Sequence, residues 1–432
     1  NDPPAFDVTR TAFSAPGPDG KPIYADARLL GEMLRRTALS VQPEGWVKAH
    51  TASDRYDIHA KMEDRACDWV QGARRYHEST GDLALIREIW PVIVRQMDYF
   101  LERRSARGLV IGREWVIWGN PLGYQTSEGA GLNAFVYKAL VDAAYLGNAL
   151  GHKDPAARFA QAAKDLSSAY NRLLWDEEHG TYYSGYETPK EELPPGVDNE
   201  NQKFPSDWRM PPKPAMLENR LLASSVYPAL FALDQEIVPP ERRARVTRYL
   251  LAQPDPKPRI MFNYYYWKQL YAANEPARDR FILDTMRQKW KTMAESPWQT
   301  TWEEFGEGSK AHCYGMFPGY FLSAYVLGVR PELPISRKRL LIEPHLGDLT
   351  SAEGIVVTEH GPVPVSWKIE NGSIRFHIEI PAGVTTTLRV PKPGAGGKLI
   401  LAGKPVASRD HGRFLETELG AGVHDGRIEQ SH

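Results

Sequence analysis

The segment Thr300–Phe305 places two adjacent carboxylates beside an aromatic ring. It reads Thr-Thr-Trp-Glu-Glu-Phe, so Glu303 and Glu304 directly follow Trp302, and His312 comes shortly afterwards. Hydrolysis of a glycosidic bond uses two carboxyl groups: one is protonated and donates to the leaving oxygen, while the other is ionised and activates water or attacks the sugar. The segment therefore contains the residue types that acid–base chemistry on a sugar requires.

The same carboxylates also have a structural interpretation. Glu303 and Glu304 could lie in the first turn of a helix, where solvated acidic side chains interact favourably with the helix dipole. The residue types alone do not separate this interpretation from the catalytic one.

Apolar residues at helical spacing dominate the chain from about residue 24 to 330. The predicted helices include residues 132–150, 155–175, 276–294 and 310–327, with no β-type alternation between them. Helices that follow one another as antiparallel pairs favour a toroid of helical hairpins, an (α/α) barrel, over a four-helix bundle.

The pattern changes to short strand-like runs near Pro331. Asn371 and Gly372 separate two of these runs, which is a strong signal for a two-residue β-hairpin turn. We therefore predict a mainly α fold with a C-terminal antiparallel β-sandwich. The predicted domains are residues 1–330, the helical catalytic domain, and residues 331–432, the β-sandwich.

The composition limits the classes of partner. Fifty-three Lys and Arg residues against 54 Asp and Glu residues leave a net charge of −1, which argues against a nucleic-acid binder or a polybasic membrane-surface protein. No apolar stretch approaches the roughly 20 residues of a membrane span. The 12 Trp, 20 Tyr and 14 Phe residues suit a carbohydrate partner, although aromatic residues also fill a large core.

Two cysteines, Cys67 and Cys313, are too few for a disulfide framework or a multi-thiolate zinc site. The sequence contains no glycine-rich phosphate loop and no zinc signature, so we expect neither a metal nor a cofactor. The composition fits either the cytoplasm or an exported location in a bacterium, and it does not indicate an oligomeric state. Because the chain begins at Asn1 and shows no signal peptide, we expect a processed product or a piece of a longer protein.

Two parts of the chain resemble the α-L-rhamnosidase family of glycoside hydrolases. One is the segment 302–312, with its Trp-Glu pair and its histidine. The other is the start of the β domain, residues 341–344 (Leu-Ile-Glu-Pro) and 361–367 (Gly-Pro-Val-Pro-Val-Ser-Trp). The resemblance, which is looser over most of the remaining chain, implies an (α/α)6 barrel followed by a β-sandwich. It also implies an inverting exo-acting hydrolase that releases a terminal α-L-rhamnose or a related deoxy-sugar.

The resemblance also implies roles for individual residues. Glu303 occupies the place of the family's general base, with Glu304 as the alternative one position later. His312 occupies the place of a histidine that contacts the sugar, and Asp68 or Asp64 that of an aspartate that binds it. Trp118 resembles the aromatic wall of the sugar subsite. Apart from the resemblance, Trp115, Trp302 and Tyr265 are further candidates for sugar contacts, although Trp115 and Tyr265 could equally pack inside the helical domain.

One family element is missing from the sequence. The family carries its general acid in a stretch resembling Arg-Glu-x-x-Gly-Trp-x-Gly-Asp, which by spacing would fall at or just before Asn1, and no such stretch occurs. Three explanations are open. The general acid lies on a missing N-terminal segment, another carboxylate has taken its role, or the chain does not hydrolyse glycosides. The local candidates, in a charged run that is more often a solvated loop, are Asp54, Asp57, Glu63 and Asp64.

Two other functions stay open. A polysaccharide lyase of the α-toroid and β-sandwich type would abstract a proton with a tyrosine or histidine. Candidates for that role are Tyr264, Tyr265, Tyr314 and His312. A non-catalytic carbohydrate-binding protein that has lost its acid is the third possibility.

Overall fold

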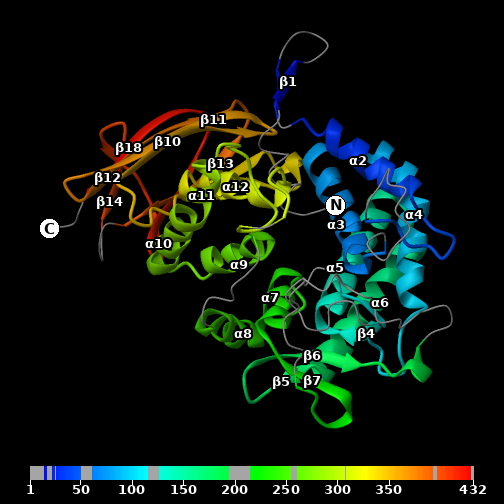
Figure 1. The fold of residues 1–432 in the computed structure, drawn as a ribbon. Coiled ribbons are helices and arrows are strands. Elements are labelled where there is room, and N and C mark those ends of the chain that lie inside the picture. Colours follow the sequence, from blue (N-terminus) through cyan, green and yellow to red (C-terminus); the bar gives the residue numbers. More distant parts are fainter. Residues whose placement is uncertain are drawn as a thin grey trace. The chain divides into compact units, whose positions relative to one another are not determined.

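A computed structural model describes most of the chain (Figure 1). The described residues are 14–16, 22–24, 26–49, 61–114, 126–193, 215–253, 260–306, 308–392 and 397–429. The chain divides into two compact units. The first comprises Asn1–Pro3, Leu30–His77 and Asp82–Gln269, and the second comprises Pro4–Leu29, Glu78–Gly81 and Leu270–His432.

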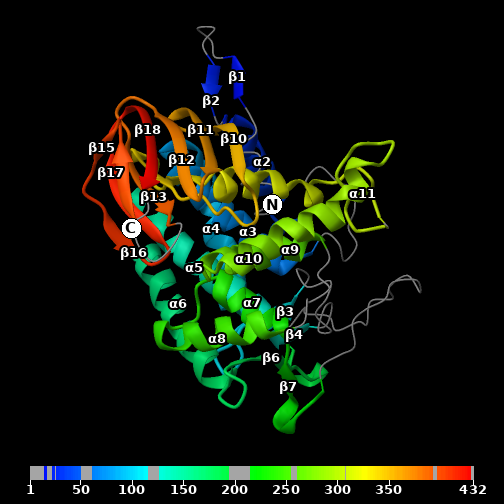
Figure 2. The same ribbon diagram turned by 90° about the vertical axis from the view of Figure 1, so that its left-hand side faces the viewer.

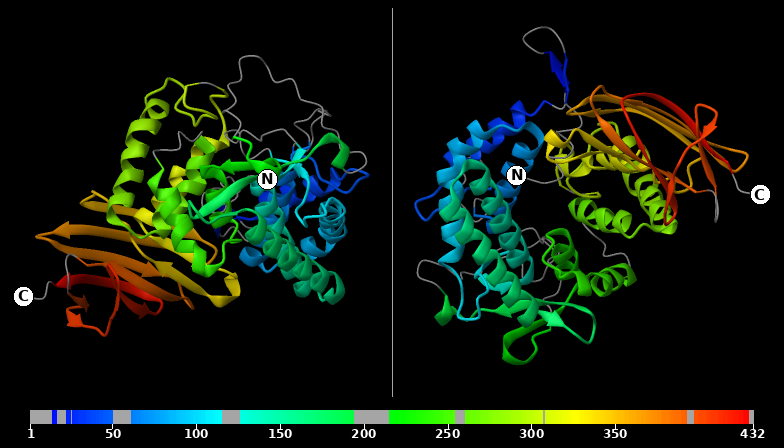
Figure 3. Two further views of the ribbon diagram at one scale, coloured as in Figure 1. Left: turned by 90° about the horizontal axis from the view of Figure 1, so that it is seen from below. Right: turned by 180° about the vertical axis from the view of Figure 1, so that it is seen from behind.

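Helices form most of the first unit, and its long helices run side by side in Figure 1 and Figure 3. Helix α4 begins where Asp82 caps the N–H groups of Ala84 and Leu85, and α5 ends at Gly151, which has φ 82°. Gly147 lets α5 approach Trp90, because a Cβ there would lie 2.8 Å from that ring. The helices in chain order are α2 (Arg28–Leu39), α3 (Glu63–Thr80), α4 (Leu83–Leu101), α5 (Ala130–Leu150), α6 (Lys153–Leu173), α7 (Val226–Asp234), α8 (Pro240–Ala252) and α9 (Ile260–Ala272).

The first unit also contains a small sheet that the sequence does not predict. Its strands have the order β3-β4-β6-β5, and β7 pairs with β6. The strands are two to seven residues long, too short for an alternating pattern to stand out. They are β3 (Gly112–Arg113), β4 (Thr126–Gly129), β5 (Trp175–Asp176), β6 (Thr181–Glu187) and β7 (Leu221–Ser224).

The second unit begins with a short hairpin and a run of helical segments. The predicted helix 276–294 is present as three consecutive segments, but the predicted helix 310–327 begins only at Cys313, because residues 309–312 pair with the chain around residue 301. The elements are β1 (Ser14–Pro16), β2 (Pro22–Tyr24), α10 (Pro276–Thr285), η4 (Met286–Trp290), α11 (Lys291–Ala294), η5 (Cys313–Met316), α12 (Pro318–Phe321) and η6 (Leu322–Val326), followed by η7 (Ile335–Arg337) between two strands.

Two sheets form the C-terminal β region (Figure 2). One has the order β10-β11-β12-β18-β14-β15 and the other β16-β17-β13-β9-β8. All pairings are antiparallel except that of β13 with β9. The strands are β8 (Val329–Glu332), β9 (Arg339–Ile342), β10 (Ser351–Thr358), β11 (Gly361–Glu370), β12 (Ser373–Ile380), β13 (Thr385–Pro391), β14 (Lys398–Leu401), β15 (Lys404–Pro405), β16 (Arg409–His411), β17 (Phe414–Leu419) and β18 (Gly422–Glu429).

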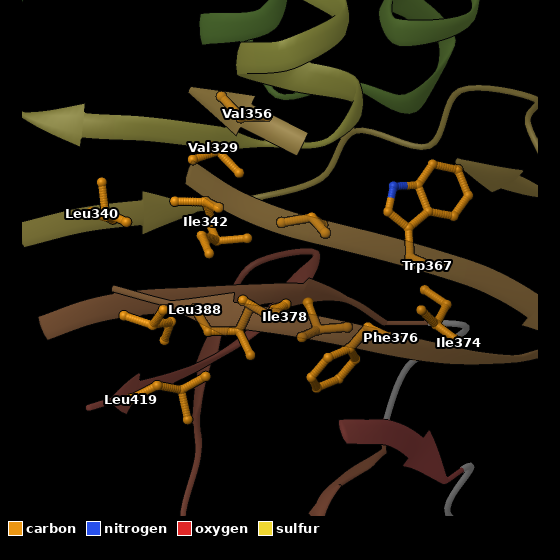
Figure 4. Packing of buried hydrophobic residues seen from close by; sticks show 14 of the residues in the cluster. Val329, Leu340, Ile342, Val356, Trp367, Ile374, Phe376, Ile378, Leu388 and Leu419 are labelled. Carbon is orange, nitrogen blue, oxygen red and sulfur yellow. The ribbon is translucent and has the colours of Figure 1, made fainter. Parts of the chain in front are cut away.

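A hydrophobic core connects the two sheets (Figure 4). Side chains such as Ile342 from β9 and Ile378 from β12 are buried in it, and the indole of Trp367 donates a hydrogen bond to the carbonyl of Val326 at 2.9 Å. The predicted hairpin turn is confirmed, since Asn371 and Gly372 have φ 51° and 74° between β11 and β12. Helices followed by these sheets confirm the predicted mainly α fold class with a C-terminal β domain.

In the part of the chain that the structure describes, no helix is long and apolar enough to cross a lipid bilayer.

Candidate functional site

The segment that carries Glu303 forms a backbone hairpin between α11 and η5. Glu303 donates its N–H to the carbonyl of Ser309 at 2.9 Å, and His312 donates its N–H to the carbonyl of Thr301 at 2.8 Å. Glu303 therefore lies in a backbone hairpin and not in the first turn of a helix, so the helix-terminus interpretation of this residue is wrong. The hairpin brings four predicted site residues onto one short segment: Trp302, Glu303, Glu304 and His312.

The carboxylate of Glu303 is held at the closed end of this hairpin. Its Oε2 accepts the N–H of Ser309 at 3.1 Å, and a Cβ at Gly308 would lie 2.9 Å from the same oxygen. Gly308 has φ 73°, a conformation that glycine adopts without steric cost. The side chain of Glu303 is half-buried, so its carboxylate is oriented by the backbone and still reaches solvent.

Trp302 packs into the hairpin. It is only 5% exposed, and Nζ of Lys310 lies 3.9 Å from the centre of its ring. The same ammonium donates to the carbonyl of Gly306 at 2.9 Å, so Lys310 links the ring to the loop. A sugar contact by Trp302 stays a prediction.

His312 caps η5 through its side chain. Its Nδ1 accepts the N–H of Tyr314 at 3.2 Å, and the two rings lie 4.1 Å apart. Because Nδ1 is an acceptor, the proton of the neutral ring is on Nε2. The half-buried imidazole can therefore donate a hydrogen bond from Nε2 to a ligand oxygen.

Asp64 and Asp68 lie at the start of α3 in the first unit. Both residues are buried, with 1% and 2% exposure. Asp64 accepts the N–H of Arg65 at 2.9 Å, and Asp68 forms an ion pair with Nη1 of Arg65 at 3.1 Å. Nη2 of Arg65 lies 2.8 Å from the sulfur of Met261. The geometry gives Asp68 a buried charged partner and places both aspartates together on one helix.

Glu63 is a further buried carboxylate of this run. It accepts hydrogen bonds from the hydroxyl of Tyr99 and, at 2.5 Å, from the N–H of Arg113. Burial and the neighbouring Glu63 raise the pKa of Tyr99. The solvated-loop interpretation is therefore wrong for Glu63 and Asp64, because both start a buried helix. Asp54 and Asp57 lie outside the described residues.

Of the aromatic residues predicted to contact a sugar outside the hairpin, the structure describes only Tyr265. Tyr265 is fully buried, and its ring contacts those of Phe231 and Tyr264 at 5.5 and 5.3 Å between centroids. Trp115 and Trp118 lie outside the residues that the structure describes. The predicted site residues that are described thus fall into the hairpin of the second unit, the start of α3, and the interior of the first unit.

Comparison with protein-family models assigns both parts of the chain. Residues 23–326 match the bacterial α-L-rhamnosidase six-hairpin glycosidase domain, and residues 328–398 match the bacterial α-L-rhamnosidase C-terminal domain. The chain belongs to the bacterial α-L-rhamnosidase family. This family consists of glycoside hydrolases, and the predicted family assignment is confirmed. A search of curated protein sequences finds no match.

Solved α-L-rhamnosidase structures share this fold. A rhamnosidase of Bacillus sp. GL1 is 23% identical with a TM-score of 0.68, and the match covers 85% of this chain and 37% of that one. The α-L-rhamnosidase of Dictyoglumus thermophilum is 14% identical with a TM-score of 0.71, covering 99% and 46%. The enzyme of Streptomyces avermitilis, in complex with L-rhamnose, is 15% identical with a TM-score of 0.69, covering 99% and 38%. The chain spans less than half the length of these rhamnosidases.

The hairpin also contains contacts that sequence reasoning missed. The backbone N–H of Ser309 orients Glu303, and Lys310 covers Trp302. No spacing rule predicts either contact, because both arise from the pairing of the two arms of the hairpin. The glycines at 306 and 308 were the available signal, since clustered glycines indicate a tight turn.

Proposed function

We propose that the chain is the catalytic part of an inverting, exo-acting α-L-rhamnosidase. It would release a terminal α-L-rhamnose or a related deoxy-sugar from a glycoside or polysaccharide. The observation that carries this proposal is the carboxylate of Glu303, which a backbone N–H holds at the tip of the hairpin within a six-hairpin glycosidase domain. In this proposal, residues 1–330 form the catalytic domain and residues 331–432 form the β-sandwich domain.

Glu303 acts as the general base in this proposal. Its half-buried carboxylate takes a proton from water, and that water attacks the anomeric carbon on the face opposite the leaving group. Glu304, which is also half-buried, is the alternative base one position later. His312 donates from Nε2 to a hydroxyl group of the bound sugar and orients it.

A second carboxyl group must protonate the leaving oxygen. In an inverting enzyme the two carboxyl groups stand about 6.5–9.5 Å apart, so that a water molecule fits between the base and the sugar. Asp54, Asp57, Glu63 and Asp64 remain the local candidates for this acid. Asp68, Trp115, Trp118, Trp302 and Tyr265 remain candidates for sugar contacts.

Glu303→Gln tests the proposal, because the amide keeps the shape of the side chain and loses its basicity. We expect kcat on an aryl α-L-rhamnoside to fall about 10²–10⁴-fold, while thermal unfolding is unchanged. Glu304→Gln is the matched control and should retain most activity. NMR of the first product should show the inverted anomer of the sugar.

Three results would contradict the proposal. Full activity of Glu303→Gln would remove the assigned base. A first product with retained configuration would exclude inversion. Absorbance from an unsaturated sugar product would identify a lyase.

A further inference from the structure

Trp298 exposes a large aromatic surface in the same segment as Glu303. Its side chain is 59% exposed, in contrast to the buried Trp302. The two ring centroids lie 6.4 Å apart with planes at 71°, so the rings meet edge to face. An exposed indole on the hairpin of a proposed glycosidase site offers a flat apolar face that a ring-shaped ligand can cover.

The backbone around Trp298 is fixed in a turn. Gln299 has φ 47°, which non-glycine residues adopt uncommonly. Its N–H donates to the carbonyl oxygen and to Oγ of Ser296 at 3.1 and 3.3 Å, and Oγ of Ser296 donates to the carbonyl of Met293 at 2.8 Å. These bonds order the backbone next to Trp298, so a ligand that stacks on its ring does not have to order this turn.

Trp302 does not offer a comparable surface. It is almost fully buried, and the ammonium of Lys310 covers one face of its ring at 3.9 Å from the centroid. Trp298 therefore has the larger ring surface on which a ligand can stack.

We propose that Trp298 binds the ring next to the terminal sugar, which is the ring of the leaving group. This inference rests on the proposed function, because an exo-acting hydrolase must accommodate the ring that is attached to the sugar it removes. An aromatic aglycone and the next sugar of a chain both present a flat face to an indole, so the shared chemistry is stacking on a six-membered ring. The contact raises affinity for ring-bearing substrates and leaves the affinity for the free terminal sugar unchanged.

Calorimetry in the Glu303→Gln background tests this, since the proposed function predicts that this variant binds without turnover. The probes are L-rhamnose, methyl α-L-rhamnoside, p-nitrophenyl α-L-rhamnoside and a disaccharide with a terminal α-L-rhamnose. We expect Trp298→Ala to weaken binding of the last two by roughly five- to tenfold, and the first two not at all. Trp298→Phe should restore most of the loss. Phe281→Ala, which removes a 38% exposed ring on α10, is the matched control.

The outcomes separate the two proposals. If Trp298→Ala weakens binding of the aryl rhamnoside alone, the subsite is supported and binds aromatic aglycones. If it weakens binding of both the aryl rhamnoside and the disaccharide, the subsite is supported and accepts either an aromatic ring or a sugar ring. Equal effects of Trp298→Ala on all four probes, or no effect on any, overturn the subsite. If the wild-type protein cleaves no rhamnoside and Glu303→Gln binds none of the probes, the proposed function fails together with the subsite.

Discussion

Glu303 and Ser309 are joined by two hydrogen bonds that run in opposite directions. The N–H of Glu303 donates to the carbonyl of Ser309 at 2.9 Å, and the N–H of Ser309 donates to Oε2 of Glu303 at 3.1 Å. The second bond replaces the backbone partner that an ordinary antiparallel pair would use. The position of the carboxylate is therefore set by the backbone of the loop between these two residues.

Gly308→Ala should displace this carboxylate. A Cβ at Gly308 would lie 2.9 Å from Oε2 of Glu303, and φ 73° adds backbone strain for alanine. Because a shift of about 1 Å in a catalytic group can cost about 10²-fold, we expect kcat on an aryl α-L-rhamnoside to fall roughly 10- to 100-fold. Steady-state kinetics measure the fall in kcat. Thermal unfolding of the exposed loop variant should change little.

Gly306→Ala provides the control for backbone strain. Gly306 also has a left-handed φ, 104°, but a Cβ there would meet no atom within 4 Å. If Gly306→Ala lowers kcat as much as Gly308→Ala does, the loss is due to backbone strain and not to contact with Glu303.

The two cysteines should react very differently with a thiol reagent. Cys67 is completely buried. Burial raises the pKa of its thiol, and the negative charge of the nearby Asp68 raises that pKa further. Cys313 is exposed, with its sulfur 4.0 Å from Nδ1 of His312. Since the thiolate is the reactive form, we expect one thiol per chain to react with a chromogenic disulfide in the native protein and a second after unfolding.

Ligand protection extends this measurement to the proposed site. If His312 contacts the sugar, saturating L-rhamnose should slow the labelling of Cys313. The Cys313→Ser variant should show no rapid labelling. Two fast-reacting thiols in the native wild-type protein would contradict the burial of Cys67.

Sequence reasoning worked where neighbours along the chain decide the structure. Helical periodicity and the Asn371-Gly372 signal predicted the order of helices and sheets, and the Trp302-Glu303 pair indicated which segment carries the candidate base. It failed where hydrogen bonds between residues that are distant along the chain determine the local structure. Residues 310–312 have helical spacing, yet their hydrogen bonds go to Thr300 and Thr301. The burial of Asp64 likewise depends on tertiary packing, which charge density in the sequence does not reveal.

Asp68 can be tested as a structural residue against its predicted role in sugar binding. Its carboxylate is buried and paired with the buried Arg65 at 3.1 Å. Removal of one partner leaves an uncompensated buried charge, so we expect Asp68→Ala to lower the free energy of unfolding by about 3–5 kcal/mol. The double variant Asp68→Leu with Arg65→Met should recover much of this loss. Urea unfolding measures both, and loss of rhamnose binding with unchanged stability would favour the sugar contact.

Glu343 should make the stability of the second unit depend on pH in the acid range. Its Oε1 pairs with Arg330 at 2.6 Å and contacts Nε2 of His345 at 3.3 Å, while Oε2 pairs with Arg389 at 2.7 Å. Burial alone would raise the pKa of Glu343, but the hydrogen bonds and charges of these partners outweigh burial and lower the pKa to about 2, from an ordinary 4.5. The ionised carboxylate therefore stabilises the folded state.

The sign of the effect follows from this lowered pKa. Its stabilisation is fully present above pH 4.5, the ordinary pKa of the group, and is lost as the pH falls towards about 2. We expect Glu343→Gln to lose about 3 kcal/mol at pH 7 and to approach the wild-type protein near pH 2, as urea unfolding at several pH values would show. Glu418→Gln removes a half-exposed partner of Arg339 and should change stability by less than about 1 kcal/mol at any pH. A difference between wild type and Glu343→Gln that stays constant from pH 7 to pH 2 would exclude this carboxylate as the titrating group.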